Sequence, residues 1–291
     1  MMDFIPAKTI LQKHAHGDQW FGADYNMNLY KGCPHGCIYC DSRSDCYRVE
    51  NFDTVRGKAN EIETLERELQ TRKRRGVVGI GAMSDTYNPL EKQYEITRKA
   101  LLLIQKYGFG VSLETKSDLI VRDMDIFTKI RAGVILKLSV TAADDELSKK
   151  IEPNVCASSA RFRAVKTLSD AGLFTGVLLC PIIPFITDAE ENIRAVIRLA
   201  YENGAKFVWS PGGVTLRDSQ REYFYKQLDK HFSGLKEQYI RTFGNSYACH
   251  SPNKNLAVVF KEECLKYGLL YKMGDIIRGY KKAEVDLFTS I

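Results

Sequence analysis

The chain has 291 residues (33.1 kDa), of which 44% are hydrophobic and 27% are charged. These values are ordinary for a globular protein and exclude a wholly disordered chain. The formal net charge of +6 permits an anionic partner, but only a clustered basic patch would indicate nucleic acid.

Apolar runs and the number of cysteines indicate the cellular compartment in which the protein is expected. The longest apolar run, 177–186, is interrupted by Pro181 and Pro184 and is far shorter than the roughly 20 residues of a membrane span. The N-terminal sequence lacks a basic start and an apolar stretch, so we expect no secretory signal. Eight cysteines are too few for a disulfide scaffold at this length. We therefore expect reduced thiols, a cytoplasmic protein and no membrane partner.

Short β-branched or apolar runs alternate with amphipathic stretches along the chain. The runs predict six strands, over 25–30, 77–82, 110–115, 134–140, 174–180 and 206–210. The stretches predict helices over 58–75, 91–107, 158–171 and 188–203, each followed directly by a glycine, with Asp188 as a helix cap. This alternation predicts a parallel α/β sheet with right-handed crossovers, either open and doubly wound or closed into a complete or partial barrel.

The pattern changes after about residue 211. Helices are predicted over 218–232 and 256–267, with an irregular stretch between them and a polar tail behind them. We interpret residues 1–23 as an N-terminal extension, 24–214 as the core, and 215–291 as a C-terminal helical appendage that closes the mouth of the core.

The loop after the first strand reads K-G-C-P-H-G-C-I-Y-C and places Cys33, Cys37 and Cys40 in a C-x3-C-x2-C spacing. Three thiolates on one tight loop can face a common point, which suits soft metal ligation. A structural zinc ion needs four ligands, so it would also require Cys46, His35 or a distant residue. A [4Fe–4S] cluster held by three cysteines leaves one iron open, and the spacing and loop position favour this alternative.

This motif, with the aromatic Tyr39 before its last cysteine and a place after the first strand of a β/α series, resembles that of the radical S-adenosylmethionine (SAM) enzymes. The resemblance covers about residues 25–211. It implies a partial parallel (β/α)6 barrel of the TIM type, in which the open iron binds the amino and carboxylate groups of SAM. It also implies reductive cleavage of SAM to a 5′-deoxyadenosyl radical that removes hydrogen from a substrate, and an electron donor of the flavodoxin or ferredoxin type.

Further SAM-binding candidates stand at the ends of the next three strands. Ser84 and Asp85 can accept hydrogen bonds from an ammonium group, and Lys116 can neutralise a carboxylate. Ser139 and Thr141 share one face of a strand by period two and can meet carboxylate or ribose. This set resembles the spore photoproduct lyase branch of the family. The resemblance implies a nucleic-acid lesion as substrate and SAM contacts at Ser84, Asp85, Lys116 and Ser139.

The chain differs from these lyases at two positions. Their hydrogen-donating cysteine stands just before the Ser-Asp pair, where this chain has Ala82 and Met83, and a tyrosine follows their third cluster cysteine, where this chain has Asp41. We therefore expect a radical SAM enzyme with another substrate. The alternatives are a true repair lyase that uses Cys180 or a tyrosine as hydrogen donor, and a zinc-binding module without catalysis.

The remaining cysteines carry less information. Cys180, at the end of the fifth strand, is either that hydrogen donor or a buried structural cysteine. No pattern assigns a role to Cys46, Cys156, Cys249 or Cys264.

Overall fold

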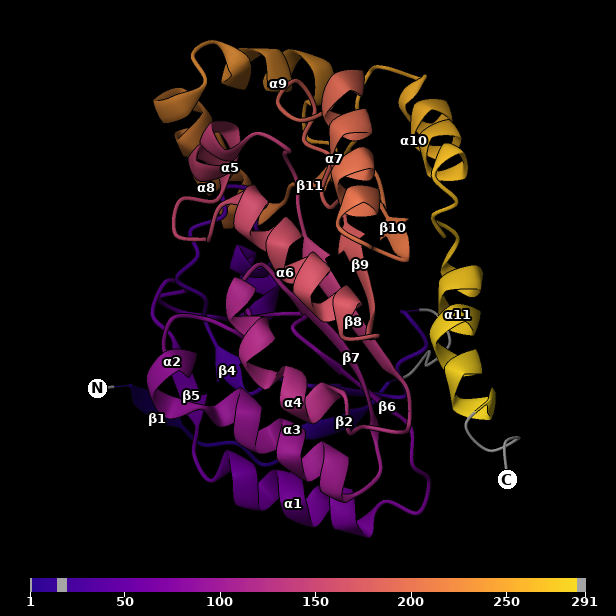
Figure 1. Ribbon diagram of the computed structural model, residues 1–291. Helices are drawn as coiled ribbons and strands as arrows, with labels where there is room; N and C mark the ends of the chain where they lie inside the picture. Colours follow the sequence, from indigo (N-terminus) through magenta and orange to yellow (C-terminus); the bar gives the residue numbers. More distant parts are fainter. Residues whose placement is uncertain (1, 15–19, 287–291) are drawn as a thin grey trace.

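The computed structural model describes residues 2–14 and 20–286, which form an α/β fold around one main sheet (Figure 1). Within these residues, seven strands pair in the order β10-β9-β8-β7-β6-β3-β2. Six of them are parallel and follow one another in chain order: β3 (Tyr25–Met27), β6 (Val77–Ile80), β7 (Gly110–Thr115), β8 (Val134–Ser139), β9 (Phe174–Leu178) and β10 (Phe207–Trp209). The seventh, β2 (Leu11–Lys13), pairs antiparallel with β3. No described strand joins β2 to β10, so the predicted partial (β/α)6 barrel is confirmed and is open.

The strands form where the sequence predicts them because their apolar residues are buried on both faces of the sheet. In β8, Ile135, Leu136 and Leu138 are fully buried, which is typical of a parallel strand covered on both sides. The register pairs Leu113 of β7 with Leu136 of β8. Since neighbouring strands are parallel, the carboxyl ends of β6, β7 and β8 lie at the same edge of the sheet.

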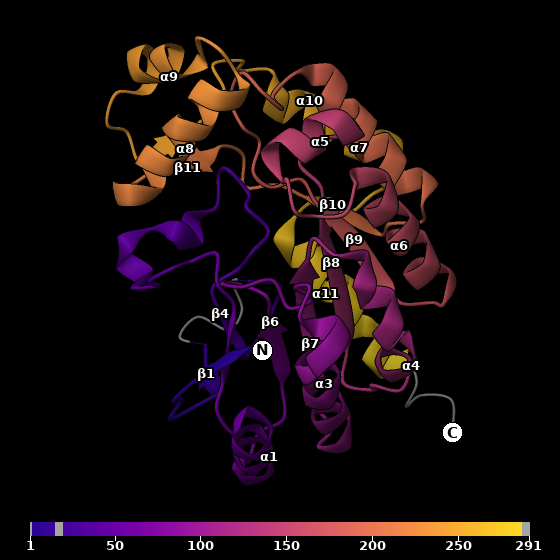
Figure 2. The ribbon, with the colours of Figure 1, turned by 90° about the vertical axis from the view of Figure 1, so that its left-hand side faces the viewer.

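Helices connect these strands and cover the outer face of the sheet (Figures 1 and 2). Three predicted helices are confirmed with shorter bounds, as α1 (Glu61–Thr71), α6 (Ser158–Asp170) and α7 (Glu190–Glu202). The prediction of one helix over 91–107 is wrong: Glu95, with a left-handed φ of 50°, separates α2 (Glu91–Tyr94) from α3 (Ile96–Lys106). Shorter helices not predicted from the sequence are η3 (Asp118–Asp123), α4 (Met124–Phe127) and α5 (Asp145–Ile151).

Asp188 is not the cap of α7, so this prediction is also wrong. The N-cap position is Ala189, which makes no side-chain cap hydrogen bond. The Asp188 carboxylate instead accepts a hydrogen bond from the Ser251 hydroxyl, which belongs to a distant part of the chain. Asp188 thus makes a tertiary contact with Ser251 in place of the local helix cap that the sequence predicts.

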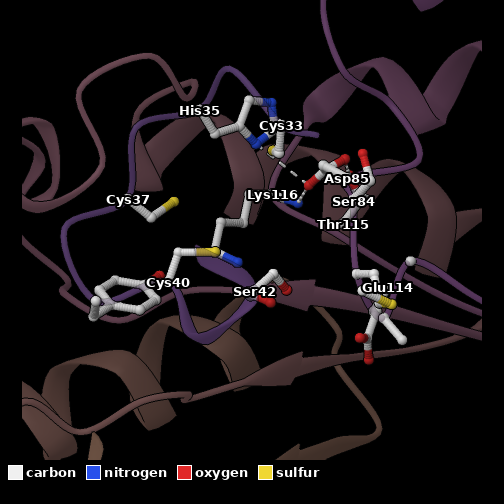
Figure 3. Close-up of a pocket in the computed structure, with 15 residues that line it drawn as sticks. Cys33, His35, Cys37, Cys40, Ser42, Ser84, Asp85, Glu114, Thr115 and Lys116 are labelled. Atoms are coloured by element: carbon white, nitrogen blue, oxygen red, sulfur yellow. Dashed lines mark hydrogen bonds and ion pairs between the residues drawn. The ribbon is translucent and has the colours of Figure 1, made fainter. Parts of the chain in front are cut away.

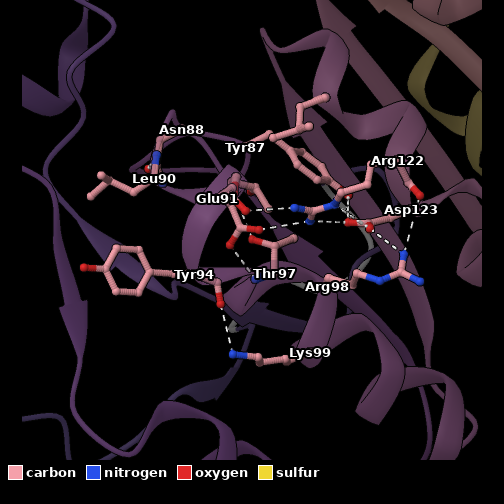
Figure 4. A network of polar contacts seen from close by, with 12 residues as sticks. Tyr87, Asn88, Leu90, Glu91, Tyr94, Thr97, Arg98, Lys99, Arg122 and Asp123 are labelled. Carbon is pink, nitrogen blue, oxygen red and sulfur yellow. Dashed lines mark hydrogen bonds and ion pairs between the residues drawn. The ribbon is translucent and has the colours of Figure 1, made fainter. Parts of the chain in front are cut away.

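A largely buried network of charges joins α2, α3 and η3 (Figure 4), and its Glu91 carboxylate also contacts the strand that leads into the cysteine motif. Arg122 of η3 contacts Glu91 Oε2 at 3.0 Å and Asp123 Oδ2 at 2.8 Å. Arg98 of α3 pairs with the other oxygen of Asp123 at 2.8 Å. Tyr30, in β4 (Tyr30–Lys31), donates its hydroxyl to Glu91. The base of the cysteine motif is therefore tied to α2 and η3.

The cysteine motif lies in a long excursion from a second, smaller sheet. In this sheet β5 (Arg56–Lys58) pairs with β1 (Asp3–Ile5) and with β4. We call residues 32–55, between β4 and β5, the cysteine loop. It contains two short helices, η1 (Asp41–Arg43) and η2 (Asp45–Tyr47).

The C-terminal part of the chain is more helical than the sequence predicts. The predicted helices are confirmed as α8 (Asp218–His231) and α10 (Leu256–Lys266). The polar tail forms α11 (Met273–Asp286), and α9 (Leu235–Phe243) lies in a stretch for which no helix was predicted. The stretch predicted to be irregular includes β12 (Ala248–Cys249), which pairs with β11 (Val214–Thr215).

The division into an extension, a core and an appendage, with boundaries after residues 23 and 214, stays a prediction. Residues 1 and 15–19 of the expected extension, and 287–291 of the expected appendage, lie outside the described residues. None of the helices in the described chain has the length and apolar character to cross a membrane.

Candidate functional site

The cysteine loop begins with a sharp turn that only glycine fits. Gly32 has a φ of 84°, and a Cβ atom there would lie 2.3 Å from the carbonyl oxygen of Thr54. The turn is closed by the Cys33 amide, which donates to the carbonyl of Phe52 at 2.7 Å. The turn fixes the start of the loop that carries the three motif cysteines.

Cys33, Cys37 and Cys40 line one cavity of about 100 Å³ together with the ends of three strands (Figure 3). We call it the cysteine cavity. It lies at the carboxyl ends of β6, β7 and β8, the edge where α/β proteins of this architecture bind ligands. The predicted residues Tyr39, Ser84, Asp85, Lys116 and Ser139 line it as well. Residues from separate strand ends are thus brought together as the sequence predicts.

Asp85 holds the loop after β6 to the end of β7. Its Oδ1 accepts hydrogen bonds from the Tyr87 amide (2.9 Å) and the Thr115 hydroxyl (2.6 Å), and its Oδ2 accepts from the Lys116 amide (2.8 Å). His35 of the cysteine loop lies 3.5 Å from the same Oδ2. The Ser84 hydroxyl donates to the carbonyl of Gly32. Ser84 and Asp85 therefore join the cysteine loop to the sheet as well as facing the cavity.

Lys116 is the cation of the cavity. Its ammonium lies 5.9 Å from the centre of the Tyr39 ring, among the cysteine thiols. Burial opposes its charge, but nearby Cys37, Glu152 and Asp85 outweigh this effect and raise the pKa of Lys116 above its usual value. A permanent positive charge at this place can bind a carboxylate.

Thr141 does not line the cysteine cavity, contrary to its predicted role. It is fully buried behind the cavity, where its hydroxyl lies 3.3 Å from both the Tyr39 hydroxyl and Glu152 Oε1. Tyr39 turns its ring to the cavity and donates its hydroxyl to Glu152. Arg161 pairs with the other Glu152 oxygen at 2.5 Å and donates to the carbonyl of Ser139 at 2.8 Å. These residues support the cavity wall from behind.

Cys180 is likewise absent from the lining of the cysteine cavity. Its side chain is half-buried, and burial raises the pKa of its thiol to about 12. Among the other cysteines, Cys156 donates its thiol to the carbonyl of Lys116, Cys249 and Cys264 are buried, and Cys46 is exposed. All eight cysteines are free thiols.

Two lining residues, Ser42 and Glu114, were not singled out from the sequence. Glu114 has a recognisable signal, because it lies two residues before Lys116 near the end of a strand. Ser42 lies in the cysteine loop, where no periodicity says which side chain faces inward.

Asp41, which stands where the lyases have a tyrosine, points away from the cavity toward the C-terminal part of the chain. Its carboxylate pairs with Arg217 at 2.5 Å and accepts hydrogen bonds from Thr215 and Tyr47 at 2.9 Å. Thr215 lies in β11 and Arg217 directly before α8, and Figure 2 shows the cysteine loop beneath these two elements; Tyr47 belongs to the cysteine loop itself. Ala82 and Met83, at the other differing position, do line the cavity.

The donor set fits an iron–sulfur cluster. Three free thiols from one loop line one cavity, and a [4Fe–4S] cluster with one open iron takes three cysteine ligands. Burial raises the pKa of these thiols, to about 12 for Cys33, and a bound metal centre would deprotonate them. Among the described residues, no three His, Cys, Asp or Glu side chains surround one point as ligands of a single metal ion do.

The family model of the radical SAM superfamily matches residues 27–200. The chain therefore belongs to the radical SAM superfamily.

Curated relatives include an uncharacterised protein of Methanocaldococcus jannaschii, 34% identical over 172 residues, which are 59% of this chain and 65% of that protein. An uncharacterised protein of Mycobacterium tuberculosis is 29% identical over 224 residues, 74% of this chain and 66% of the relative. The chain thus spans just under two thirds of the length of these relatives.

Solved structures of spore photoproduct lyase share the fold. The lyase complexed with dinucleoside spore photoproduct superposes with a TM-score of 0.66 at 15% identity, over 88% of this chain and 78% of that one. A mutant of the lyase with bound SAM and the same dinucleoside gives the same TM-score, identity and coverage. The resemblance to this branch is confirmed at the level of the fold.

Proposed function

We propose that this protein is a radical SAM enzyme whose [4Fe–4S] cluster is held by Cys33, Cys37 and Cys40. The observation that carries the proposal is the cysteine cavity, where these thiols and the polar ends of three strands face one space. When bound, the cluster supplies the electron that cleaves SAM to the 5′-deoxyadenosyl radical, which takes hydrogen from a substrate.

The charge of each cavity-lining residue determines which group of SAM it is suited to bind. The Lys116 ammonium is the group suited to the SAM carboxylate, and Ser139 adds a hydroxyl to the same wall. Ser84 and Asp85 are suited to the SAM ammonium group, and the ring of Tyr39 bounds the cavity on the cysteine side. Thr141 does not line the cavity and would act through the side chains it contacts, Tyr39 and Glu152.

The substrate is separate from this assignment. The fold shared with the lyases makes a nucleic acid the alternative substrate. Repair of a thymine lesion, however, needs a thiol that returns hydrogen to the product. Neither Ala82 nor Met83 has a thiol, and Cys180 does not line the cavity. We therefore propose a substrate other than a thymine lesion. Salt-dependent binding of DNA, and loss of turnover in Cys180→Ala, would instead support the repair lyase.

The partner and compartment follow from the same chemistry. A reductant of the flavodoxin or ferredoxin type would supply the electron, and a reducing compartment such as the cytoplasm would keep the eight thiols free.

Anaerobic reconstitution with iron and sulfide, followed by SAM and dithionite, tests the proposal. We expect iron and sulfide to bind with a brown colour and 5′-deoxyadenosine to form. Cys33→Ala should lose both the visible absorption and the product, whereas Lys116→Met should keep the absorption and bind SAM at least about tenfold more weakly. Colourless protein that binds zinc, or Cys33→Ala with unchanged absorption, would contradict the proposal.

A further inference from the structure

A second cavity lies on the inner face of the sheet, directly next to the cysteine cavity. Its volume is about 50 Å³, and its polar lining includes Asn26, Ser112, Glu114 and Lys137. Ala82 and Glu114 line both cavities. We call this second space the inner cavity. Because the two share these walls, a molecule that occupies one can extend into the other.

The polar lining is unusual for its position. Ser112 and Glu114 alternate along β7, and Lys137 and Ser139 along β8, so each pair projects from one face of its strand. The interior of a parallel barrel is ordinarily filled by Val, Ile and Leu. Here Lys137, 1% exposed, stands in such a position. A fold that needed only packing would not place a charge there.

Of the two charges in the inner cavity, the Glu114 carboxylate is the less well paired. Lys137 donates to the Ser112 hydroxyl at 3.0 Å and lies 3.5 Å from Glu114 Oε2, with the Phe21 ring centre 4.4 Å away. Within the described residues, Glu114 Oε2 is buried and accepts no hydrogen bond. Burial lowers the pKa of Lys137, and Glu114 opposes this effect. A buried ion pair of this kind contributes little to stability. Buried charges that packing alone does not require are found mainly at functional sites.

We propose that Glu114 and Lys137 bind a neutral, amide-like group of the substrate, with an N–H directed to Glu114 and a carbonyl oxygen directed to Lys137. This inference rests on the proposed function, which places the reacting part of the substrate in the adjoining cysteine cavity. The opposite charges of the pair favour a neutral ligand with both a donor and an acceptor. At roughly 10–15 Å³ per water, the inner cavity holds about four non-hydrogen atoms, enough for a carboxamide.

Hydrogen transfer from small deuterated amides tests this assignment. The reconstituted protein would be given SAM, dithionite as electron donor, and either propionamide or N,N-dimethylpropionamide, each deuterated on the propionyl carbons. The radical would take one deuterium atom from a probe that lies next to it, and mass spectrometry of the 5′-deoxyadenosine counts that atom. The carbon radical left on the probe would be reduced by dithionite and protonated by water. We expect propionamide to deliver about tenfold more deuterium, because only propionamide can donate to Glu114.

The outcomes separate the two proposals. If no 5′-deoxyadenosine forms in any sample, the proposed function fails, and this inference fails with it. If the product forms but carries equal deuterium with both amides, or none, only the assignment of the inner cavity is overturned.

A stability measurement distinguishes ligand binding from a structural role of the pair. The double variant Glu114→Leu/Lys137→Met replaces both charges with apolar groups, so we expect its Tm to equal or exceed that of the wild type. Lys137→Met alone leaves Glu114 unpaired and should lower the Tm. Lys166→Met, at an exposed pair with Asp170, is the control and should leave the Tm unchanged. A double variant with a lower Tm than the wild type would show that the pair holds the fold and would overturn the inference.

Discussion

Glu152 is the residue on which the back of the cysteine cavity depends. It is 1% exposed and contacts both Tyr39 and Arg161, so it links the cysteine loop to α6. Burial alone would raise the pKa of the carboxyl, but the charges of Arg161 and Lys116 lower it below the usual value. The carboxylate is therefore held in its charged form.

We expect Glu152→Gln to lower the free energy of unfolding by about 3–5 kcal/mol, because it leaves the Arg161 guanidinium buried without its counter-charge. Urea unfolding at pH 7 measures this difference. Glu146→Gln is the control, since its pair with Lys149 is exposed and should change stability by less than about 0.5 kcal/mol. Equal effects of the two substitutions would contradict the buried-pair interpretation.

The same pair has a pH dependence of known sign. Because the folded state lowers the pKa of Glu152, the pair stabilises the protein above the unfolded-state value of about 4.3, and its contribution disappears as the pH falls below that. The difference between wild type and Glu152→Gln should shrink in the same range.

At the scale of single residues, the sequence predicts those cavity-lining residues whose positions follow from local geometry. The cysteines share one loop, and Ser84, Asp85, Lys116 and Ser139 follow from the rule that parallel strands end at one edge. Thr141 was placed on the same face as Ser139 by period two, but β8 ends at Ser139, so the alternation no longer applies. The partners of Glu152 could not be predicted, because they come together only by tertiary packing.

At the scale of elements, α8 and β11 pack against the cysteine loop and form hydrogen bonds with it. Gln220 donates to the carbonyl of Tyr39 at 3.3 Å, Tyr223 to that of Gly36 at 3.3 Å, and Ser219 to the Asp45 carboxylate at 2.6 Å. The Asp41–Arg217 pair belongs to the same contact. The loop that carries the thiols is thus contacted by a part of the chain 174 to 187 residues away.

We expect Arg217→Ala to loosen the cysteine loop without unfolding the protein. Amide hydrogen exchange at residues 41–47 should become roughly tenfold faster, because Asp41 loses its charged partner, while exchange in β7 and β8 stays the same. Lys236→Ala removes an exposed pair with Asp229 and serves as the control. Uniform acceleration over the whole chain, or none in the loop, would show that this contact does not order the loop.

The elements themselves were predictable to different degrees. The six parallel strands and their helices follow from strong apolar periodicity. The break at Glu95 was missed because the apolar pattern continues across it. In α11 the inward residues Ile276 and Tyr280 are four positions apart, a helical spacing that the polar residues around them hide.

At the scale of the whole molecule, the segment around Phe21 and the C-terminal segment from Leu270 through α11 meet beside β10, at one edge of the main sheet. Leu270 forms a single parallel bridge with Phe207 of β10, and α11 follows it. The Tyr280 hydroxyl donates to the carbonyl of Phe21 at 2.7 Å, and both rings belong to the cluster that includes Phe207 and Ile276. Segments from opposite ends of the sequence therefore cover the part of the sheet that barrel closure would otherwise protect.

This arrangement makes the stability of the fold depend on α11. Ile276 is fully buried among those rings, so Ile276→Ala should lower the free energy of unfolding by about 2–5 kcal/mol through lost contacts and the cavity that remains. Urea unfolding followed by tryptophan fluorescence measures the change, since Trp20 and Trp209 pack against Phe21. Arg278→Ala, on the exposed side of the same helix, should stay within about 0.5 kcal/mol of the wild type. If α11 were peripheral, both variants would unfold at the urea concentration of the wild type, and the chain ends would not share the core.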